Sequence, residues 1–285
     1  MKPSNVVIIG TGRFACACLE ACLVKTKNIV CVEPENPGFP TLRSMCIKRS
    51  IKYNCLLERD KLTDFFSGIS SPTLVVSAYN SFMFPKAVLA NRSLRIINFH
   101  NSLLPRHRGR NAPTFTIFEM DAVTGITWHL VSAEIDKGEI ICQRVMAVPA
   151  DINAIDLTRK TLELGAAAFQ EILPSLLDGN YGFKSSGDPS EETFHLSTDV
   201  PNGGILDLGW SLPKAHAFLR SLDYGNLKVF PPAQIQFLGS HFSVLKYAVK
   251  HDESGTSQGT TIETHNGQLV LRDGAMYLTI DCRKT

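Results

Sequence analysis

The sequence predicts an α/β domain with a mostly parallel, doubly wound sheet, followed by a smaller β domain. Two observations predict the first part. Short apolar runs alternate with helical patterns up to residue 178, and the first run ends in a tight glycine turn that opens a helix. A third observation predicts the second part: beyond residue 205 the apolar runs are short and are separated by turn signals.

The first strand is predicted at residues 5–9, and the turn Gly10-Thr11-Gly12 leads into a helix over residues 13–25. Later elements continue this alternation, which is typical of a Rossmann-like fold. Prolines and a glycine between Pro34 and Pro40 predict an irregular loop. The remaining predicted strands are 29–32, 73–78, 94–99, 125–131 and 139–147, and the remaining predicted helices are 41–49, 61–66, 113–119 and 154–177.

The composition changes near residue 183, where Ser, Asp, Pro and Gly become frequent and predict a linker over 183–204. A catalytic domain is therefore predicted over 1–182 and a C-terminal domain over 205–285. In the C-terminal part a helix at 212–222 precedes five short strands, with hairpin signals at Asn266-Gly267 and Asp273-Gly274. This pattern favours a small barrel of the OB type. The predicted strands are 234–237, 241–249, 260–264, 268–271 and 276–280.

Charge and composition exclude several classes of protein. The 285 residues are 44% hydrophobic and 20% charged, as in soluble globular proteins. The net charge of +2 gives no sign of the basic excess that a dedicated nucleic-acid binder shows. No run approaches the roughly 20 apolar residues that a membrane span needs. The N-terminus runs straight into a strand without a signal-peptide pattern, so a cytoplasmic protein is expected.

The cysteines do not form a metal-binding pattern. Cys16, Cys18 and Cys22 lie within one predicted helix, where Cys18 and Cys22 share a face and Cys16 lies well round from Cys18. Neither a CxxC spacing nor a nearby histidine completes a zinc site. Buried free thiols are therefore expected, and no metal.

The glycine turn has a second interpretation. Gly10, Gly12 and Ala15 approximate a dinucleotide fingerprint, and Glu33 follows at the distance of a ribose-binding acid. A nicotinamide or flavin cofactor is thus an alternative. However, the tight turn alone requires glycine, so the pattern is weak evidence for a nucleotide.

Polar chemistry begins where the strand at 94–99 ends, in the stretch NFHNSLLPRHRGRNAP. Strand alternation puts Asn98 and His100 on one face at a carboxyl end, where open α/β sheets bind their ligands. An amide can stabilise the oxyanion formed when an amine attacks a formyl carbon. A histidine can move the protons, and a carboxylate can orient it. Asp136, on a loop between strands and followed by Gly138, is the best candidate, and the pattern favours acyl transfer.

The motif from Asn98 to Pro105, with Arg108-Gly109 and Ile135-Asp136-Lys137-Gly138, closely resembles the folate-dependent N-formyltransferases. These enzymes act on glycinamide ribonucleotide, methionyl-tRNA or nucleotide sugars. The resemblance covers residues 5–178, and the C-terminal part is similar to the end domain of the methionyl-tRNA branch. It implies 10-formyltetrahydrofolate as donor, no nucleotide cofactor in the glycine turn, and a catalytic trio of Asn98, His100 and Asp136. It also implies a pterin pocket formed by Phe82, Met83, Phe84, Ser132, Ala133, Glu134 and Ile135.

The candidate acceptor-binding residues are Arg106, Arg108, Arg110 and His129. Arginines beside the site suit an anionic acceptor, and a solvated turn explains them equally well. His129 lies on a predicted strand, where it either faces the site or packs against its neighbours.

Three acceptors are ranked from resemblance. Residues 125–129 and 220–225 resemble formyltransferases of non-ribosomal peptide or siderophore assembly, so an amino-acid-type or carrier-bound amine comes first. The HNS stretch resembles enzymes of nucleotide-linked amino sugars, which come second. Methionyl-tRNA comes third, because a proline-rich, acidic-leaning segment replaces a long basic loop and the net charge is near neutral. A 10-formyltetrahydrofolate hydrolase and an inactive folate-binding module stay as alternatives.

Overall fold

The structure, a computed structural model, describes residues 1–34, 41–184, 187–251, 261–265, 268–273 and 275–285. It divides into two compact units, each assembled from three stretches of chain. Unit 1 comprises Met1–Gly109, Gly125–Met146 and Lys160–Phe194, and unit 2 comprises Arg110–Thr124, Ala147–Arg159 and His195–Thr285. The chain leaves and re-enters unit 1 twice, whereas the predicted domain limits at 182 and 205 assume consecutive segments. Within the described residues, no helix is both long and apolar enough to cross a membrane.

Unit 1 is built on a seven-stranded sheet in the order β3-β2-β1-β4-β5-β7-β8. β1 to β5 pair in parallel, and β7 pairs antiparallel with β5. The mostly parallel α/β sheet predicted from the alternating apolar runs is therefore confirmed. Its strands are β1 (Asn5–Gly10), β2 (Ile29–Glu33), β3 (Lys52–Cys55), β4 (Thr73–Ala78), β5 (Leu94–His100), β7 (Val123–Leu130) and β8 (Ile140–Ala147).

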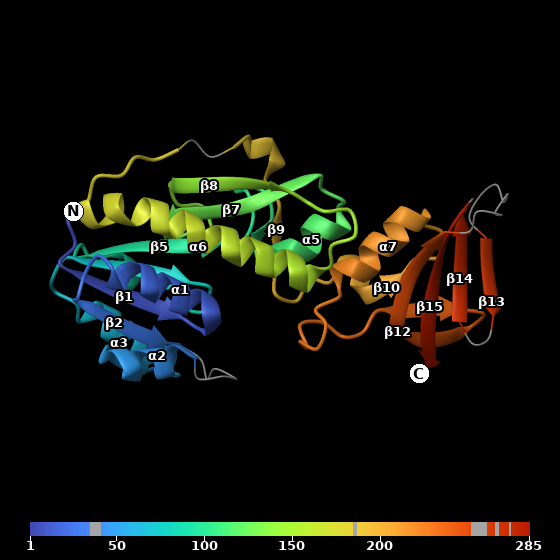
Figure 1. Cartoon of the computed structure of the whole chain (residues 1–285), viewed down its shortest axis with the longest axis horizontal. Helices are drawn as coiled ribbons and strands as arrows, with labels where there is room; N and C mark the ends of the chain where they lie inside the picture. Colours follow the sequence, from blue (N-terminus) through green and yellow to red (C-terminus); the bar gives the residue numbers. More distant parts are fainter. Residues whose placement is uncertain (35–40, 185–186, 252–260, 266–267, 274) are drawn as a thin grey trace. The chain divides into compact units, whose positions relative to one another are not determined.

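Helices cover both faces of this sheet (Figure 1). One core joins the strands to α1 (Gly12–Leu23), α2 (Thr41–Arg49) and the later turns of α6 (Ala154–Asp178). The other core joins them to α3 (Arg59–Ser67) and α4 (Lys86–Leu89). Strand residues alternate between these two cores, which is the arrangement expected of a doubly wound sheet.

The cysteines of the N-terminal region contribute to the first core. Cys16, Cys18 and Cys22 of α1 pack there with Cys31 of β2 and Cys46 of α2. All five are buried free thiols, as predicted for the helix cluster, whereas Cys55 at the end of β3 is exposed. They act as small apolar side chains in a close-packed interior.

A close contact with α6 fixes the backs of β5 and β7. A Cβ atom on Gly165 of α6 would lie 2.1 Å from Cε2 of Phe99, so only glycine lets the helix approach this ring. The Gly165 carbonyl also accepts a hydrogen bond from Trp128 Nε1 at 3.0 Å. Because Phe99 and Trp128 face α6, the residues that alternate with them face the other side of the sheet.

Unit 2 packs α5 (Ala112–Phe118) and α7 (Leu212–Ser221) with a six-stranded sheet in the order β10-β11-β12-β15-β14-β13. Leu212, Phe218, Ile235 and Leu278 belong to its core. The predicted C-terminal β domain is present, and its described strands form a row with β10 and β13 at the ends. Its strands are β10 (Ile205–Leu206), β11 (Gln234–Phe237), β12 (Ser240–His251), β13 (Thr261–His265), β14 (Gln268–Asp273) and β15 (Met276–Lys284).

Several short elements are not predicted by the sequence patterns. They are β3, β6 (Arg108–Gly109), β9 (Phe194–His195), β10 and the 3-10 turns Pro189–Glu191 and Pro201–Gly204. Some predictions lie outside the described residues: most of the loop between Pro34 and Pro40, the hairpin turn Asn266-Gly267, and Gly274 of the second hairpin. The strands beside both hairpin signals do pair antiparallel, β13 with β14 and β14 with β15.

Candidate functional site

The register between β5 and β7 assembles the polar side chains of the site. Asn98 is directly opposite His129, and His100 is directly opposite Thr127. Side chains of directly opposed residues in an antiparallel pair lie on the same face and close together. The two residues predicted from strand alternation, Asn98 and His100, thus share a face with a second histidine. All of these residues belong to unit 1.

A chain of hydrogen bonds orients the amide of Asn98. Ser77 Oγ donates to Asn98 Oδ1 at 2.6 Å, and Asn80 Nδ2 donates to Ser77 Oγ at 2.8 Å. Asn80 is itself held, because its Oδ1 accepts the Phe82 N–H at 2.8 Å. With the Asn98 oxygen engaged by Ser77, the amide nitrogen Nδ2 lies 3.2 Å from His129 Nε2. Asn98 therefore presents N–H donors to the site.

His100 is a buried histidine with one nitrogen anchored. Its Nε2 lies 2.7 Å from the backbone carbonyl of His107, which can only accept, so Nε2 carries the hydrogen. Its Nδ1 faces Asp136 Oδ2 at 3.5 Å. Burial lowers the pKa of His100 below its ordinary value, and the Asp136 carboxylate opposes this only in part. At neutral pH, Nδ1 is therefore an unprotonated nitrogen beside a carboxylate.

Asp136 lies between the two histidines. Its Oδ1 is 3.4 Å from His129 Nε2, and its Oδ2 accepts the Gly109 N–H at 2.9 Å. Burial alone would raise the pKa of Asp136, but His100, His129 and the Gly109 N–H outweigh it and hold the pKa well below its usual range. Asp136 is therefore ionised at neutral pH.

The backbone around Asp136 explains the glycine of its motif. Asp136 has a φ of 52°, in the left-handed region. A Cβ atom on Gly138 would lie 1.6 Å from the carbonyl oxygen of Leu130, so no other residue fits this position. The loop is thereby pressed against the end of β7, which keeps Asp136 close to His129 and His100.

His129 connects the amide and the carboxylate. Its Nδ1 lies 2.8 Å from the carbonyl oxygen of Leu130, so Nδ1 carries a hydrogen. Its Nε2 lies 3.2 Å from Asn98 Nδ2 and 3.4 Å from Asp136 Oδ1, within reach of both groups. His129, predicted as an acceptor-binding candidate, lies beside Asn98 and Asp136 of the predicted catalytic trio.

Thr127 fixes the turn that follows His100. Its Oγ1 donates to the carbonyl of Ser102 at 2.8 Å and accepts the Leu104 N–H at 3.2 Å. Ser102 Oγ in turn donates to the carbonyl of Arg106 at 2.6 Å. The hydroxyls of Ser102 and Thr127 thus hold the SLLP turn, which contains a cis peptide before Pro105.

Sequence reasoning missed Ser77, Asn80 and Thr127. A signal for two of them was available, because Ser77 follows the apolar run 74–76 and Thr127 lies between Ile126 and Trp128. A buried polar side chain in such a strand needs a partner, and that partner marks the site.

The segment Phe82-Met83-Phe84 is predicted to form part of a pterin pocket. Two of its residues, Phe82 and Phe84, pack against the core. The Phe82 and Phe84 rings lie 6.0 Å and 5.3 Å from the ring of Phe66 in α3. Met83 between them is 47% exposed. Met83 is therefore the residue of this segment whose side chain is most open to a ligand, and the pocket itself stays a prediction.

The loop predicted to complete that pocket is mostly exposed. Ala133, Glu134 and Ile135 are open to solvent, and Ser132 Oγ donates to the Glu134 carbonyl at 2.9 Å. The loop leads directly to Asp136. It can therefore offer backbone groups to a ligand beside Asn98, His100 and Asp136, and its folate contacts stay a prediction.

The three predicted acceptor-binding arginines differ. Arg108 is buried, its Nε and Nη2 donate to the Ile135 carbonyl, and its Nη1 pairs with Glu192. It therefore holds the loop that carries Asp136. Arg106 is half-buried in unit 1, whereas Arg110 is exposed and belongs to unit 2. Contact of these arginines with an acceptor stays a prediction.

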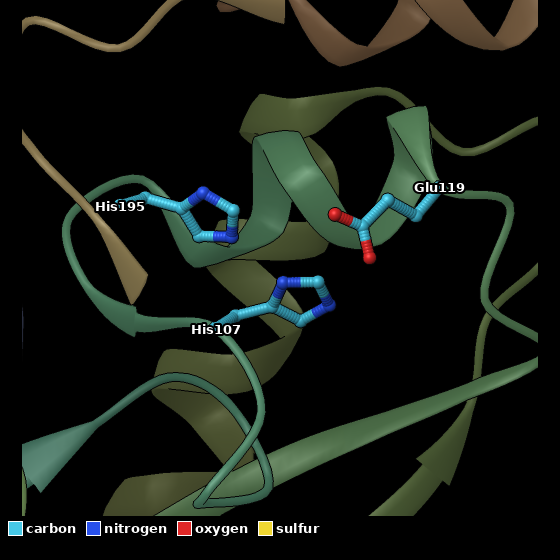
Figure 2. A group of neighbouring side chains, drawn as sticks. All are labelled: His107, Glu119 and His195. Atoms are coloured by element: carbon cyan, nitrogen blue, oxygen red, sulfur yellow. The ribbon is translucent and has the colours of Figure 1, made fainter. Parts of the chain in front are cut away.

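Two further histidines, His107 and His195, lie outside this cluster of side chains. In unit 2, a ring nitrogen of His195 lies within 4.8 Å of a carboxylate oxygen of Glu119 (Figure 2). The His195 ring also stacks on Phe115 of α5 at 3.5 Å between centroids. His107, drawn in the same figure, belongs to unit 1. There its N–H donates to Thr193 Oγ1 at 2.7 Å and its carbonyl binds His100.

Comparisons with known proteins identify the family of the chain. The family model described as "Formyl transferase" matches residues 4–173. GDP-perosamine N-formyltransferase of Brucella melitensis is 25% identical over 203 residues, which cover 71% of this chain and 76% of that protein. Methionyl-tRNA formyltransferase of Clostridioides difficile is 25% identical over 288 residues, which cover 97% of this chain and 89% of that protein.

Solved structures show the same fold. WlaRD, a sugar 3N-formyl transferase, aligns with a TM-score of 0.76 at 15% identity, covering 99% of this chain and 98% of its own. An N-formyltransferase from Helicobacter canadensis, in complex with folinic acid and dTDP-3-aminofucose, aligns with a TM-score of 0.74 at 14% identity, covering 98% and 99%. Since the family model matches more than half of the sequence, the chain belongs to the formyl transferase family.

Proposed function

We propose that this N-formyltransferase moves a formyl group from 10-formyltetrahydrofolate to the amino group of a nucleotide-linked amino sugar. The observation that supports formyl transfer is the cluster of Asn98, His100, His129 and Asp136 at the carboxyl end of β5. The motifs alone favour an amino-acid-type or carrier-bound amine. The named relatives with sugar acceptors favour the amino sugar instead.

The side chains at the site fit a formyl group undergoing attack by an amine. Asn98 Nδ2 has two hydrogens, of which His129 can take at most one, so the other can bind the oxygen that gains negative charge. The oxygen of the amide is turned away toward Ser77. No acceptor atom of Asn98 therefore opposes the growing charge, and an amide donor in a buried site is worth more than in water.

His100 and Asp136 handle the protons. The reaction forms one bond from the amine nitrogen to the formyl carbon and breaks the bond from that carbon to N10 of the donor. The amine loses one proton and N10 gains one, so the site must take up and return a single proton. Nδ1 of His100 can hold it, because Asp136 Oδ2 at 3.5 Å stabilises the imidazolium that results.

The assay combines 10-formyltetrahydrofolate with three amines: a nucleotide-linked amino sugar, methionyl-tRNA and a free amino acid. Tetrahydrofolate release and the mass of each acceptor are followed together. The amino sugar is expected to gain one formyl group at a rate at least about tenfold above the other amines. The methionyl-tRNA arm is included because the Clostridioides relative aligns with nearly the whole chain.

Two variants separate catalysis from folding. His100→Ala is expected to lower turnover by roughly 10² to 10⁴. His241→Ala, at an exposed position of β12, serves as the matched control and should leave turnover unchanged. Tetrahydrofolate release without any formylated amine would indicate the hydrolase alternative. Absence of turnover with every amine, together with unchanged behaviour of His100→Ala, would contradict formyl transfer.

A further inference from the structure

Unit 2 contains a cavity of about 760 Å³. Its wall is formed by α5 and the residues after it, the segment after β8, one face of α7, and strands β12 and β15. Every one of these residues belongs to unit 2, and none of them is part of the cluster around Asn98. The volume lies within the range of small-molecule sites.

The cavity has an apolar wall and a polar group. The apolar wall includes Ile117, Met120, Val148, Leu212, Val249 and Met276. The polar group includes His216 and Arg220, which are four residues apart and share a face of α7, and Asp151 from the segment after β8. The other polar residues of the lining are Thr116, Asp121 and His251. Such a lining suits a ligand with an apolar body and one charged end.

Arg220 is a buried cation with few partners. Its side chain belongs to a residue only 9% exposed, and its Nη1 donates to the Ile152 carbonyl at 2.7 Å. Its Nε has no hydrogen-bond partner among the described residues. Arg220 takes part in none of the ion pairs identified among the described residues, although the Asp151 carboxylate is near enough to attract its guanidinium. A buried charge without a close counter-ion is costly, so an anionic partner is expected.

His216 adds hydrogen bonding without adding positive charge. Burial, and secondarily the charge on Arg220, lower the pKa of His216 to about 4, so its imidazole is neutral at pH 7. Its ring packs edge-on to Tyr247 at 5.8 Å between centroids. A neutral imidazole can donate to or accept from an oxygen-rich ligand group.

We propose that this cavity binds a small organic anion, with a carboxylate or phosphate ester group on Arg220 and an apolar or aromatic body against the opposite wall. The site is distinct from the formyl-transfer cluster and does not depend on the proposed amino-sugar acceptor. Arg220 lines the cavity, so its guanidinium can donate to the anionic oxygens of such a ligand.

Calorimetric titration of the full chain tests this with three probes of similar size: phenyl phosphate, phenylacetate and benzyl alcohol. At least one of the two anions is expected to bind at one site per chain, and comparing the two distinguishes a phosphate ligand from a carboxylate ligand. Benzyl alcohol, which keeps the aromatic body without charge, is expected to bind at least about tenfold more weakly. Failure of both anions to bind at millimolar concentration overturns the proposal.

Three variants locate the binding. Arg220→Gln is expected to raise the dissociation constant of the bound anion at least about tenfold. Arg283→Gln, at an exposed position of β15, is the matched control and should leave it unchanged. Met276→Trp fills the cavity while leaving Arg220 in place, so it should also abolish anion binding. This variant tests the location of the site if Arg220→Gln does not fold. Unchanged anion binding in Met276→Trp places the ligand elsewhere and overturns the proposal.

Discussion

The amide of Asn98 depends on its neighbours for its orientation. An asparagine side chain can turn by half a revolution and exchange its donor and acceptor ends at little cost when nothing holds it. Ser77 Oγ binds the oxygen end at 2.6 Å, and Asn80 fixes Ser77 in turn. The electrostatic role proposed for Asn98 is therefore distributed over three residues on two parallel strands and the segment after β4.

Removing the Asn98 amide is expected to lower kcat more than removing the Ser77 hydroxyl that orients it. Asn98→Ala should lower kcat by roughly 10² to 10³, as the loss of an oxyanion donor does in other enzymes. Ser77→Ala should lower kcat by about tenfold, because it loses only the bond that orients the amide. Steady-state kinetics measure both. Ser93→Ala is the control, because it removes a hydroxyl of unit 1 that donates to the exposed carbonyl of Ser70. An equal kcat in Ser77→Ala and the native chain would contradict the anchoring role.

The fall of kcat/KM at acid pH (the acid limb of the pH profile) is expected to follow the protonation of His100. The pKa of His100 lies below its ordinary value because burial disfavours the charged form. The neutral base is therefore present above that pKa, and kcat/KM falls as the pH falls through it. Asp136 raises the pKa of His100, so Asp136→Asn should move the limb to lower pH and reduce the plateau by about 10².

Measuring kcat/KM between about pH 5 and pH 8 tests this. Asp188→Asn, at an exposed carboxylate in unit 1, should leave the limb in place. A limb that moves to higher pH in Asp136→Asn would mean that the carboxylate does not favour the imidazolium.

At the scale of elements, α6 determines how β5 and β7 present the site. Gly165 lets the helix lie against Phe99, and its carbonyl holds Trp128. Because Phe99 and Asn98 are consecutive, as are Trp128 and His129, pressure on one face of these strands is transmitted to the other. The packing of Phe99 and Trp128 against α6 therefore affects the positions of Asn98 and His129 on the opposite face of the sheet.

Gly165→Ala should therefore destabilise unit 1 despite the better helix propensity of alanine. The added methyl would lie 2.1 Å from a ring atom of Phe99, which is buried between Phe14 and Trp128 and has little room to move. Overpacking of this kind costs about 1 to 3 kcal/mol. Chemical denaturation measures it, with Gly182→Ala as control because nothing lies within 4 Å of that position. Equal stabilities of the two variants would contradict the tight contact.

Much of this arrangement was predictable from local patterns, and the rest depends on pairing between distant segments. Strand alternation places Asn98 and His100 on one face, and the motif around Asp136 indicates its loop. The position of His129 follows only from its register opposite Asn98, and a single sequence does not state that register. β3 was missed because its sequence KYNC has no apolar run and lies at the edge of the sheet.

At the scale of the molecule, the division into two units could not be read from the order of the segments. α5 follows the motif directly, yet it packs with α7 in unit 2. Phe118 of α5 lies 5.9 Å from Trp210 and 6.3 Å from Phe218 between ring centroids, and Lys214 of α7 donates to its carbonyl. A composition change near residue 183 marks a connector but carries no information about such long-range contacts.

A fragment of residues 195–285 is therefore expected not to fold cooperatively by itself. It lacks residues 110–124 and 147–159, which belong to the same compact unit, and it would expose Trp210 and Phe218. Thermal unfolding followed by near-ultraviolet circular dichroism should show no sharp transition, unlike that of the full chain. A sharp transition in the fragment would mean that the C-terminal strands and α7 form an independent domain.

The buried thiols of the N-terminal region can be used to detect local unfolding of unit 1. Cys16, Cys18, Cys22, Cys31 and Cys46 are shielded from reagents while the layers of α1 and α2 stay on the sheet, whereas Cys55 is open to them. An alkylating agent will therefore mark Cys55 at once and the other five only when this part of the protein transiently unfolds. The labelling rate of each native cysteine therefore reports local unfolding at that residue, and no cysteine has to be introduced by mutation.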